Sequence, residues 1–136
     1  MPAKLDGRNV LVVDDDPDVL GSLRLAFETS GARVTTARDG NQAVEMTKKI
    51  DPDLIVLDMM MPKRSGFLVL ESIKPSRKPD ERPYVIVVTA NEGKRAEQWA
   101  KYLGVAGYMT KPFSIERVLK KACELLGGDY IDPDTL

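Results

Sequence analysis

Short runs of consecutive apolar residues recur along the chain and are typical of strands buried on both faces of a parallel sheet. The clearest run covers residues 54–57 and ends at Asp58, and a second covers residues 9–13 and ends at Asp14. Residues 84–89 form the most β-prone segment. Residues 32–37 and 105–110 read as two further strands. The pattern therefore predicts five strands.

Between these strands, apolar residues recur at the spacing of an amphipathic α-helix. Asp16-Pro17 and Ser114 are suitable helix starts, whereas Gly31 and Gly127-Gly128 are suitable ends. A fourth helix is expected over residues 93–103. The predicted inward-facing residues are Val19, Leu20, Leu23, Ala26, Phe27, Ala43, Val44, Ile50, Phe67, Leu70, Ile73, Ala96, Ala100, Leu103, Ile115, Val118, Leu119, Ala122, Leu125 and Leu126.

Five strands alternating with five helices predict an α/β fold, a single doubly wound parallel sheet covered on both faces. Right-handed crossovers restrict its topology strongly. We divide the chain into a polar lead-in (1–8), one domain (9–126) and an acidic tail (127–136) that is expected to be loose. Residues 74–83 hold three prolines and many charges, so we expect a solvated surface loop.

Composition narrows the chemistry that this domain can perform. The 136 residues include no histidine and one cysteine, Cys123, which excludes an intrachain disulfide and the usual Cys/His zinc site. A net charge of −1 gives no reason for broad attraction to nucleic acid or anionic membranes. No apolar stretch is long enough to span a bilayer, and we expect a cytoplasmic protein.

Polar residues follow four of the five predicted strands: Asp14 with Asp15, then Asp58, Thr89 and Lys111. The carboxyl ends of parallel strands share one edge of a sheet, so these side chains are expected to converge. Two carboxylates about 5 Å apart repel by roughly 3 kcal/mol at an effective dielectric near 20, so the cluster needs a cation. Oxygen ligands without His or Cys favour Mg²⁺ or Mn²⁺.

A carboxylate surrounded by a metal, a lysine and a hydroxyl is suited to accept a phosphoryl group. Asp58 would be the nucleophile, while the metal and Lys111 would neutralise the phosphoryl oxygens during transfer. Each residue alone has an ordinary structural explanation, since a single strand-end aspartate is usually a cap or turn residue. Their combined spacing makes coincidence a poor explanation.

Five segments resemble the receiver domain of two-component response regulators, the chemotaxis regulators among them. The segments are Val12-Val13-Asp14-Asp15-Asp16, Leu57-Asp58-Met59-Met60-Met61-Pro62, Gly66, Val88-Thr89-Ala90 and Tyr108-Met109-Thr110-Lys111-Pro112-Phe113. The resemblance extends from about Asn9 to Leu126. It implies a flavodoxin-like fold with strand order 2-1-3-4-5.

The resemblance also implies roles for individual residues. Asp58 would accept a phosphoryl group from a histidine kinase or histidine phosphotransfer protein, and the domain would itself catalyse this transfer and the later hydrolysis without being an enzyme in the ordinary sense. Asp14, Asp15, Asp58 and the backbone carbonyl of Met60 would hold Mg²⁺. Thr89 and Lys111 would contact phosphoryl oxygens, Lys111-Pro112 would be a cis peptide, and Tyr108 would be an aromatic switch.

Phosphorylation in this family selects one of two packings of the fourth and fifth strands and helices, which signal to a protein effector. We expect a monomer or weak dimer without direct contact to nucleic acid or membrane. Met60 and Asn91 stand where the family tunes the lifetime of the acyl phosphate. Because the Met60 side chain cannot orient a water molecule, we expect no strong acceleration of dephosphorylation from it.

Several alternatives stay open. A phosphatase of the haloacid dehalogenase type needs a second aspartate where Met60 stands, and a flavodoxin-type flavin carrier needs a phosphate loop where three acids follow the first strand. A receiver-like interaction module that works without phosphorylation is the remaining alternative. The chain could be a stand-alone receiver or part of a longer regulator.

The three methionines after Asp58 and the single tryptophan also carry expectations. Met59 and Met60 are expected to be exposed beside the site, with Met61 packed inward. Trp99 is expected either at the edge of the core or on a partner surface formed by the fourth helix, fifth strand and fifth helix.

Overall fold

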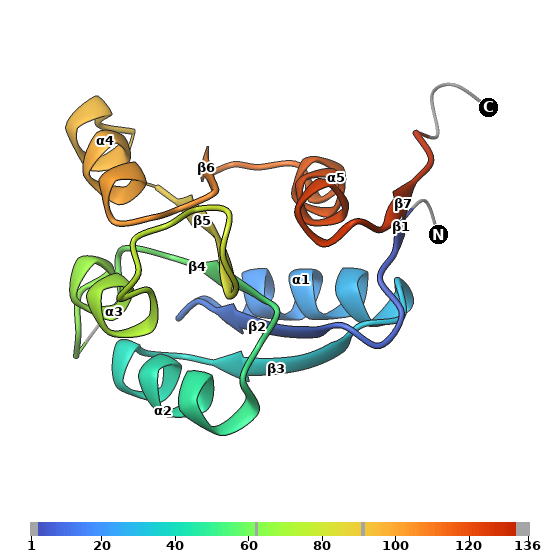
Figure 1. Ribbon diagram of the computed structural model, residues 1–136, viewed down its shortest axis with the longest axis horizontal. Coiled ribbons are helices and arrows are strands. Elements are labelled where there is room, and N and C mark those ends of the chain that lie inside the picture. The colour runs from blue at the N-terminus through green and yellow to red at the C-terminus, as the bar shows by residue number, and fades with distance from the viewer. Residues whose placement is uncertain (1–2, 62, 91, 133–136) are drawn as a thin grey trace.

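The computed structural model describes residues 3–61, 63–90 and 92–132, and it contains a parallel five-stranded sheet between two layers of helices (Figure 1). The strand order is β3-β2-β4-β5-β6, which is the predicted order 2-1-3-4-5 when these five strands are counted alone. The predicted flavodoxin-like α/β fold is therefore confirmed. The strands are β2 (Asn9–Val13), β3 (Arg33–Ala37), β4 (Leu54–Leu57), β5 (Tyr84–Thr89) and β6 (Gly107–Thr110).

Five helices connect and flank these strands. They are α1 (Pro17–Thr29), α2 (Gly40–Ile50), α3 (Gly66–Ile73), α4 (Lys94–Tyr102) and α5 (Ile115–Leu126). The side chains of Asp16, Asp39, Ser65 and Ser114 accept hydrogen bonds from backbone N–H groups in the first turns of α1, α2, α3 and α5. Gly40 is the first residue of α2.

The apolar strand runs supply two separate cores, one on each face of the sheet. Val10 and Val12 point toward α1 and α5, whereas Leu11 and Val13 point toward the face covered by α2, α3 and α4. This alternation is the reason that the strands are continuously apolar, since both faces must be buried. Most of the predicted inward-facing helix residues are buried, but seven are only partly buried: Val19, Val44, Ile50, Phe67, Ala96, Ile115 and Leu125. Val69 and Cys123 are buried although they were not among the predicted residues.

The two ends of the domain form a small second sheet that was not predicted from the sequence. The strand β1 (Ala3–Lys4) pairs antiparallel with β7 (Asp129–Tyr130), so the expectation of a loose tail is wrong for those residues. Ala3 and Leu5 are buried, and the Leu5 N–H donates to the Ser30 carbonyl at 2.7 Å. The apolar residues of the lead-in therefore cover the end of the α1–α5 core. Residues 133–136 lie outside the described part of the chain.

The loop between α3 and β5 is not uniformly solvated. Residues 75–82 are exposed, but Lys74 is 1% exposed, and its ammonium donates to the backbone carbonyl of Glu81. The Lys74 N–H also donates to Leu70 O at 2.8 Å and so ends α3. Burial lowers the pKa of Lys74. The prediction of a solvated lysine here is therefore wrong, because the long side chain closes the loop on itself.

None of the helices in the described residues has the length and apolar character required to cross a bilayer.

Candidate functional site

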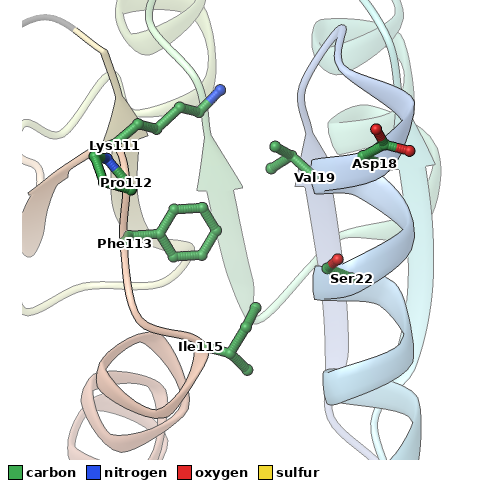
Figure 2. A pocket seen from close by; sticks show the side chains of 7 residues that line it. All are labelled: Asp18, Val19, Ser22, Lys111, Pro112, Phe113 and Ile115. Carbon is green, nitrogen blue, oxygen red and sulfur yellow. The ribbon is translucent and has the colours of Figure 1, made fainter.

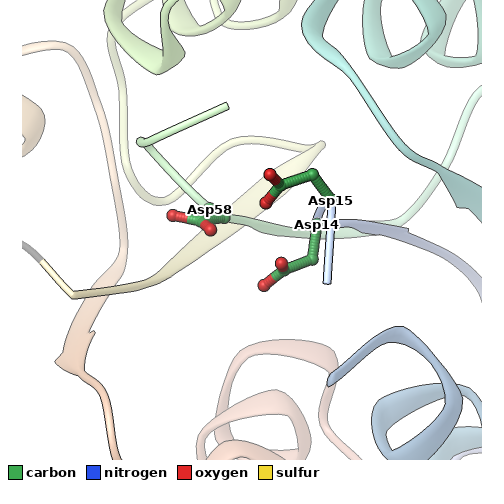
Figure 3. A group of neighbouring side chains, drawn as sticks. All are labelled: Asp14, Asp15 and Asp58. Atoms are coloured by element: carbon green, nitrogen blue, oxygen red, sulfur yellow. The ribbon is translucent and has the colours of Figure 1, made fainter. Parts of the chain in front are cut away.

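Three acids converge at the carboxyl edge of the sheet. Asp14 follows β2 and Asp58 follows β4, and these strands are neighbours. One oxygen from each of Asp14, Asp15 and Asp58 lies within 4.8 Å of the other two (Figure 3). Asp14 and Asp58 are buried, whereas Asp15 is exposed. The backbone fixes both buried acids, since the Asp14 N–H donates to Ala37 O at 3.2 Å and the Asp58 N–H donates to Val13 O at 2.9 Å.

Lys111 supplies the positive charge of this cluster. Its Nζ lies 2.9 Å from Asp14 Oδ2 and 3.1 Å from Asp58 Oδ2. The Lys111 N–H donates to Thr89 O at 2.7 Å, which attaches the turn after β6 to the end of β5. The Lys111-Pro112 peptide bond is cis, as the resemblance implied.

The protonation of these groups reflects their burial and their contacts. Burial raises the pKa of Asp14, although the Asp16 N–H and the Lys111 ammonium act in the opposite direction. Burial alone would lower the pKa of Lys111, but its hydrogen bonds to Asp14 and Asp58 outweigh this effect and raise it. The lysine therefore keeps its charge, and the carboxylates of Asp14 and Asp58 share its ammonium.

The segment after Asp58 is held tightly against α3. The Met60 N–H donates to Asp58 Oδ1 at 3.0 Å, so the other oxygen of Asp58 is the one that faces Lys111. A Cβ on Gly66 would lie 2.5 Å from Met59 Cα, so only glycine permits this approach. Met59 is 5% exposed, which contradicts the expected exposure, whereas Met60 is 59% exposed as expected. Met61 is partly buried against the core on the sheet face covered by α2, α3 and α4. Pro62 lies outside the described residues.

Thr89 lies on β5, the strand next to β4, and Tyr108 lies on β6, one strand further along the sheet. Leu57 is paired with Val87, so Asp58 and Thr89 leave the same end of adjacent strands, and Thr89 is fully buried. Tyr108 is half-buried in β6 against the core formed with α2, α3 and α4. Burial, Glu97 and Asp58 together raise the pKa of Tyr108. The switch role of these residues stays a prediction, and Asn91 lies outside the described residues.

Comparison with known proteins identifies the family. A family model described as the response regulator receiver domain matches residues 10–123. The chain belongs to this family.

Solved receiver domains have the same fold. The receiver domain of Francisella response regulator 1452 is 31% identical over 89% of this chain and 98% of that one, with a TM-score of 0.78. The Vibrio cholerae chemotaxis protein CheY4 is 27% identical over 88% of this chain and 99% of that one, also with a TM-score of 0.78. A CheY-like receiver domain protein from Methanospirillum hungatei shares the fold at 24% identity, 90% and 95% coverage and a TM-score of 0.82.

The acid cluster of this receiver domain could hold a metal ion. Its three ligand oxygens are close enough to share one cation, and two of the three carboxylates are buried. Carboxylate oxygens are the ligands that hard divalent cations prefer. A second positive charge beside Lys111 would also relieve the repulsion among the three acids.

A groove of about 540 Å³ lies next to this cluster (Figure 2). Its lining comes from α1 and from the segment after β6, and consists of Asp18, Val19, Ser22, Lys111, Pro112, Phe113 and Ile115. The groove was not predicted from the sequence, because Val19 was expected in the core and Phe113 was considered only as part of a motif. Lys111 thus borders both the acid cluster and a largely apolar surface depression.

Proposed function

We propose that this receiver domain accepts a phosphoryl group on Asp58 from a histidine kinase or histidine phosphotransfer protein and then signals to a protein effector. The observation that carries the proposal is the position of the Asp58 carboxylate, which is buried beside two other acids and 3.1 Å from the Lys111 ammonium. A buried carboxylate paired with a cation and open to a metal is suited to act as a nucleophile.

In the proposed transfer, an Asp58 oxygen attacks the phosphorus of the donor's phosphohistidine. A bond forms between that oxygen and phosphorus, the phosphorus–nitrogen bond breaks, and the imidazole leaves with the electron pair. The Lys111 ammonium, already within 3.1 Å of Asp58, would neutralise one phosphoryl oxygen. We assign the Thr89 hydroxyl to a second oxygen. Mg²⁺, or Mn²⁺ in its place, would act as a Lewis acid on the phosphoryl group when held by Asp14, Asp15, Asp58 and the Met60 carbonyl.

The groove beside Lys111 offers a place for the donor to approach. Its apolar lining from α1 and from Phe113 and Pro112 could seat an apolar face of the donor protein while Lys111 stays at its edge. Such a position would bring the phosphohistidine to the acid cluster without disturbing the buried strands.

We further propose that phosphorylation acts on Thr89 and Tyr108, so that α4, β5, β6 and α5 shift between two packings. The added phosphoryl charge would stabilise only the packing that brings the Thr89 hydroxyl to it. The exposed, apolar Met60 side chain supports an acyl phosphate lifetime away from the short extreme of the family.

Intact mass spectrometry after incubation with acetyl phosphate and Mg²⁺ tests the proposal. We expect one phosphoryl adduct on the full chain, lost in Asp58→Asn and when Mg²⁺ is chelated. The matched control Asp80→Asn removes an exposed loop carboxylate and should keep the adduct. Absence of an adduct on the folded protein would contradict the proposal and leave a receiver that works as an interaction module without phosphorylation.

A further inference from the structure

One face of α4 carries an exposed cationic and aromatic surface. Arg95, Trp99 and Tyr102 follow one another at spacings of four and three residues, so they share one face of the helix. Trp99 is 49% exposed and Tyr102 is 59% exposed. Together with Arg77, which reaches over from the loop after α3, we call these residues the α4 strip.

The α4 strip is ordered by its own contacts. The Trp99 and Tyr102 rings stack with centroids 5.4 Å apart and an interplanar angle of 25°. Arg77 lies over the Tyr102 ring, with its Cζ 5.2 Å from the centroid, and its Nη1 donates to the Tyr102 hydroxyl at 3.2 Å. A surface that is already ordered loses less conformational entropy when a partner binds.

The strip borders a groove of about 570 Å³ between α3 and α4, whose described lining consists of Phe67, Gly93, Arg95, Ala96 and Trp99. Trp99 therefore faces the α3 side of α4. The two locations expected from the sequence were the edge of the core and the surface formed by α4, β6 and α5, and neither of them includes this groove. The opposite flank of α4 carries Glu97, which is paired with Lys101 at 2.8 Å and acts electrostatically on Tyr108 of β6. The strip is thus separate from the face formed by α4, β6 and α5.

The charge of this surface selects its occupant. Among the described residues, neither Arg77 nor Arg95 has an ion pair with a carboxylate, and Arg95 is the one charged side chain in the described groove lining. Arginine binds carboxylates with two parallel hydrogen bonds, and Trp, Tyr and Arg are enriched where partners bind most strongly. From Arg95 to Tyr102 the helix advances about 10 Å, or two turns.

We propose that the α4 strip and its groove bind an acidic, apolar segment of a partner protein. Apolar side chains of the segment would cover Trp99 and Phe67, and carboxylates at either end would pair with Arg95 and Arg77. The proposal does not depend on phosphorylation of Asp58 and is tested on the unphosphorylated chain.

Two other occupants fit the surface less well. Single-stranded nucleic acid also stacks on aromatic rings beside arginines, but the chain as a whole has a net charge of −1 and gives no wider basic track for a phosphate backbone. A second copy of this chain placed strip to strip by a two-fold axis would bring four guanidinium groups together without carboxylates between them.

Two labelled synthetic peptides test the charge selection. Both carry the same Leu and Phe residues on one helical face, with glutamates flanking them in one peptide and lysines in the other. Fluorescence anisotropy is expected to show the glutamate peptide binding at least about tenfold more tightly. Trp99 is the single tryptophan, so a change in its emission places the peptide at the strip.

Variants locate the binding within the strip. Arg95→Glu should reverse the preference, so that the lysine peptide binds more tightly than the glutamate peptide. Trp99→Ala should lower the affinity for the glutamate peptide by about tenfold or more. The controls Lys120→Glu and Leu25→Ala make matched changes at exposed positions on α5 and α1, and should leave binding unchanged. Circular dichroism checks that each variant is folded.

Three results would overturn the proposal. The first is equal affinity for both peptides that Arg95→Glu does not alter. The second is displacement of the glutamate peptide from Trp99 by a single-stranded oligonucleotide, which would assign the surface to nucleic acid. The third is a dimer in sedimentation that Trp99→Ala dissociates, which would assign it to a second copy of the chain.

Discussion

The Lys111 ammonium lies 3.1 Å from Asp58 Oδ2, although the two residues are 53 positions apart in the chain. The contact closes the acid cluster on the side of β6. It also means that a lysine and a divalent cation would neutralise the same carboxylates, since Lys111 reaches Asp14 as well, at 2.9 Å. Lys111 and a bound divalent cation would therefore repel each other, although each of them would stabilise the ionised form of the acids.

Lys111→Met is expected to tighten Mg²⁺ binding and slow phosphorylation. Removing the nearby positive charge should favour the metal by about 1–2 kcal/mol, or roughly five- to thirtyfold in affinity. The initial rate of adduct formation from acetyl phosphate should fall by about a hundredfold, because a fixed donor to the phosphoryl oxygens is lost. Calorimetric Mg²⁺ titration and intact mass measure the two effects. Lys120→Met, an exposed change on α5, should alter neither, and weaker Mg²⁺ binding in Lys111→Met would contradict the expectation.

Gly66→Ala and Gly21→Ala should change stability in opposite directions. A Cβ at Gly66 would lie 2.5 Å from Met59 Cα and 2.9 Å from Met59 O, so the backbone must move, at a cost of about 1–3 kcal/mol in unfolding free energy. A Cβ at Gly21, inside α1, meets nothing within 4 Å, and alanine should stabilise the helix by about 0.5–1 kcal/mol. Urea denaturation measures the free energy of unfolding of each variant relative to the wild type. Equal stability of the two variants would argue against the close packing of Met59 on α3.

Much of the fold followed from local pattern. The strands β2, β4 and β5 are apolar because both faces are buried, and Asp16 and Ser114 cap helices where the sequence placed them. The grouping of Asp14, Asp15, Asp58 and Lys111 also followed, because it requires only that parallel strands end at one edge of the sheet.

Features that depend on contacts between distant segments could not be predicted from the local sequence pattern. Lys74 is buried in a loop whose composition is typical of a solvated segment. Its partner is the backbone carbonyl of Glu81, and the sequence contains no signal for such a contact. Met59 and Met60 are chemically identical, but Met59 is buried in the core close to Gly66, whereas Met60 is exposed. The β1–β7 pair has two residues in each strand, too few for a periodic pattern to appear.

Gly128→Ala is expected to open the β1–β7 pair. A Cβ at Gly128 would overlap the Lys4 backbone carbonyl oxygen, and the nearby Cys123 Sγ donates to Asp129 O at 3.5 Å. Cys123 is 2% exposed and burial raises its pKa, so alkylation of this single cysteine should be slow in the native chain. The variant should accelerate alkylation and amide exchange at residues 3–5 and 129–130. Gly21→Ala should leave both the alkylation and the amide exchange slow. Unchanged alkylation in Gly128→Ala would argue against the pairing of β1 with β7.

The stability contribution of Lys74 should depend on pH. Burial lowers its pKa in the folded state, so between that value and the unfolded value of about 10.4 the unfolded chain binds more protons. The free energy of unfolding contributed by Lys74 therefore rises with pH in that window and is constant below it. In Lys74→Met, which lacks the ionisable group, this rise is absent, so the wild-type chain should gain stability relative to the variant as pH increases.

Urea denaturation of both proteins from about pH 7 to about pH 10 measures the difference. Because Cys123 and Tyr108 titrate in both chains, their contributions cancel when the two curves are subtracted. Lys120→Met, which removes an exposed lysine, should give a curve parallel to the wild type. A Lys74→Met curve that is also parallel would mean that the folded chain leaves the Lys74 ammonium as well solvated as the unfolded chain does, and that the Glu81 carbonyl contact is not kept in solution.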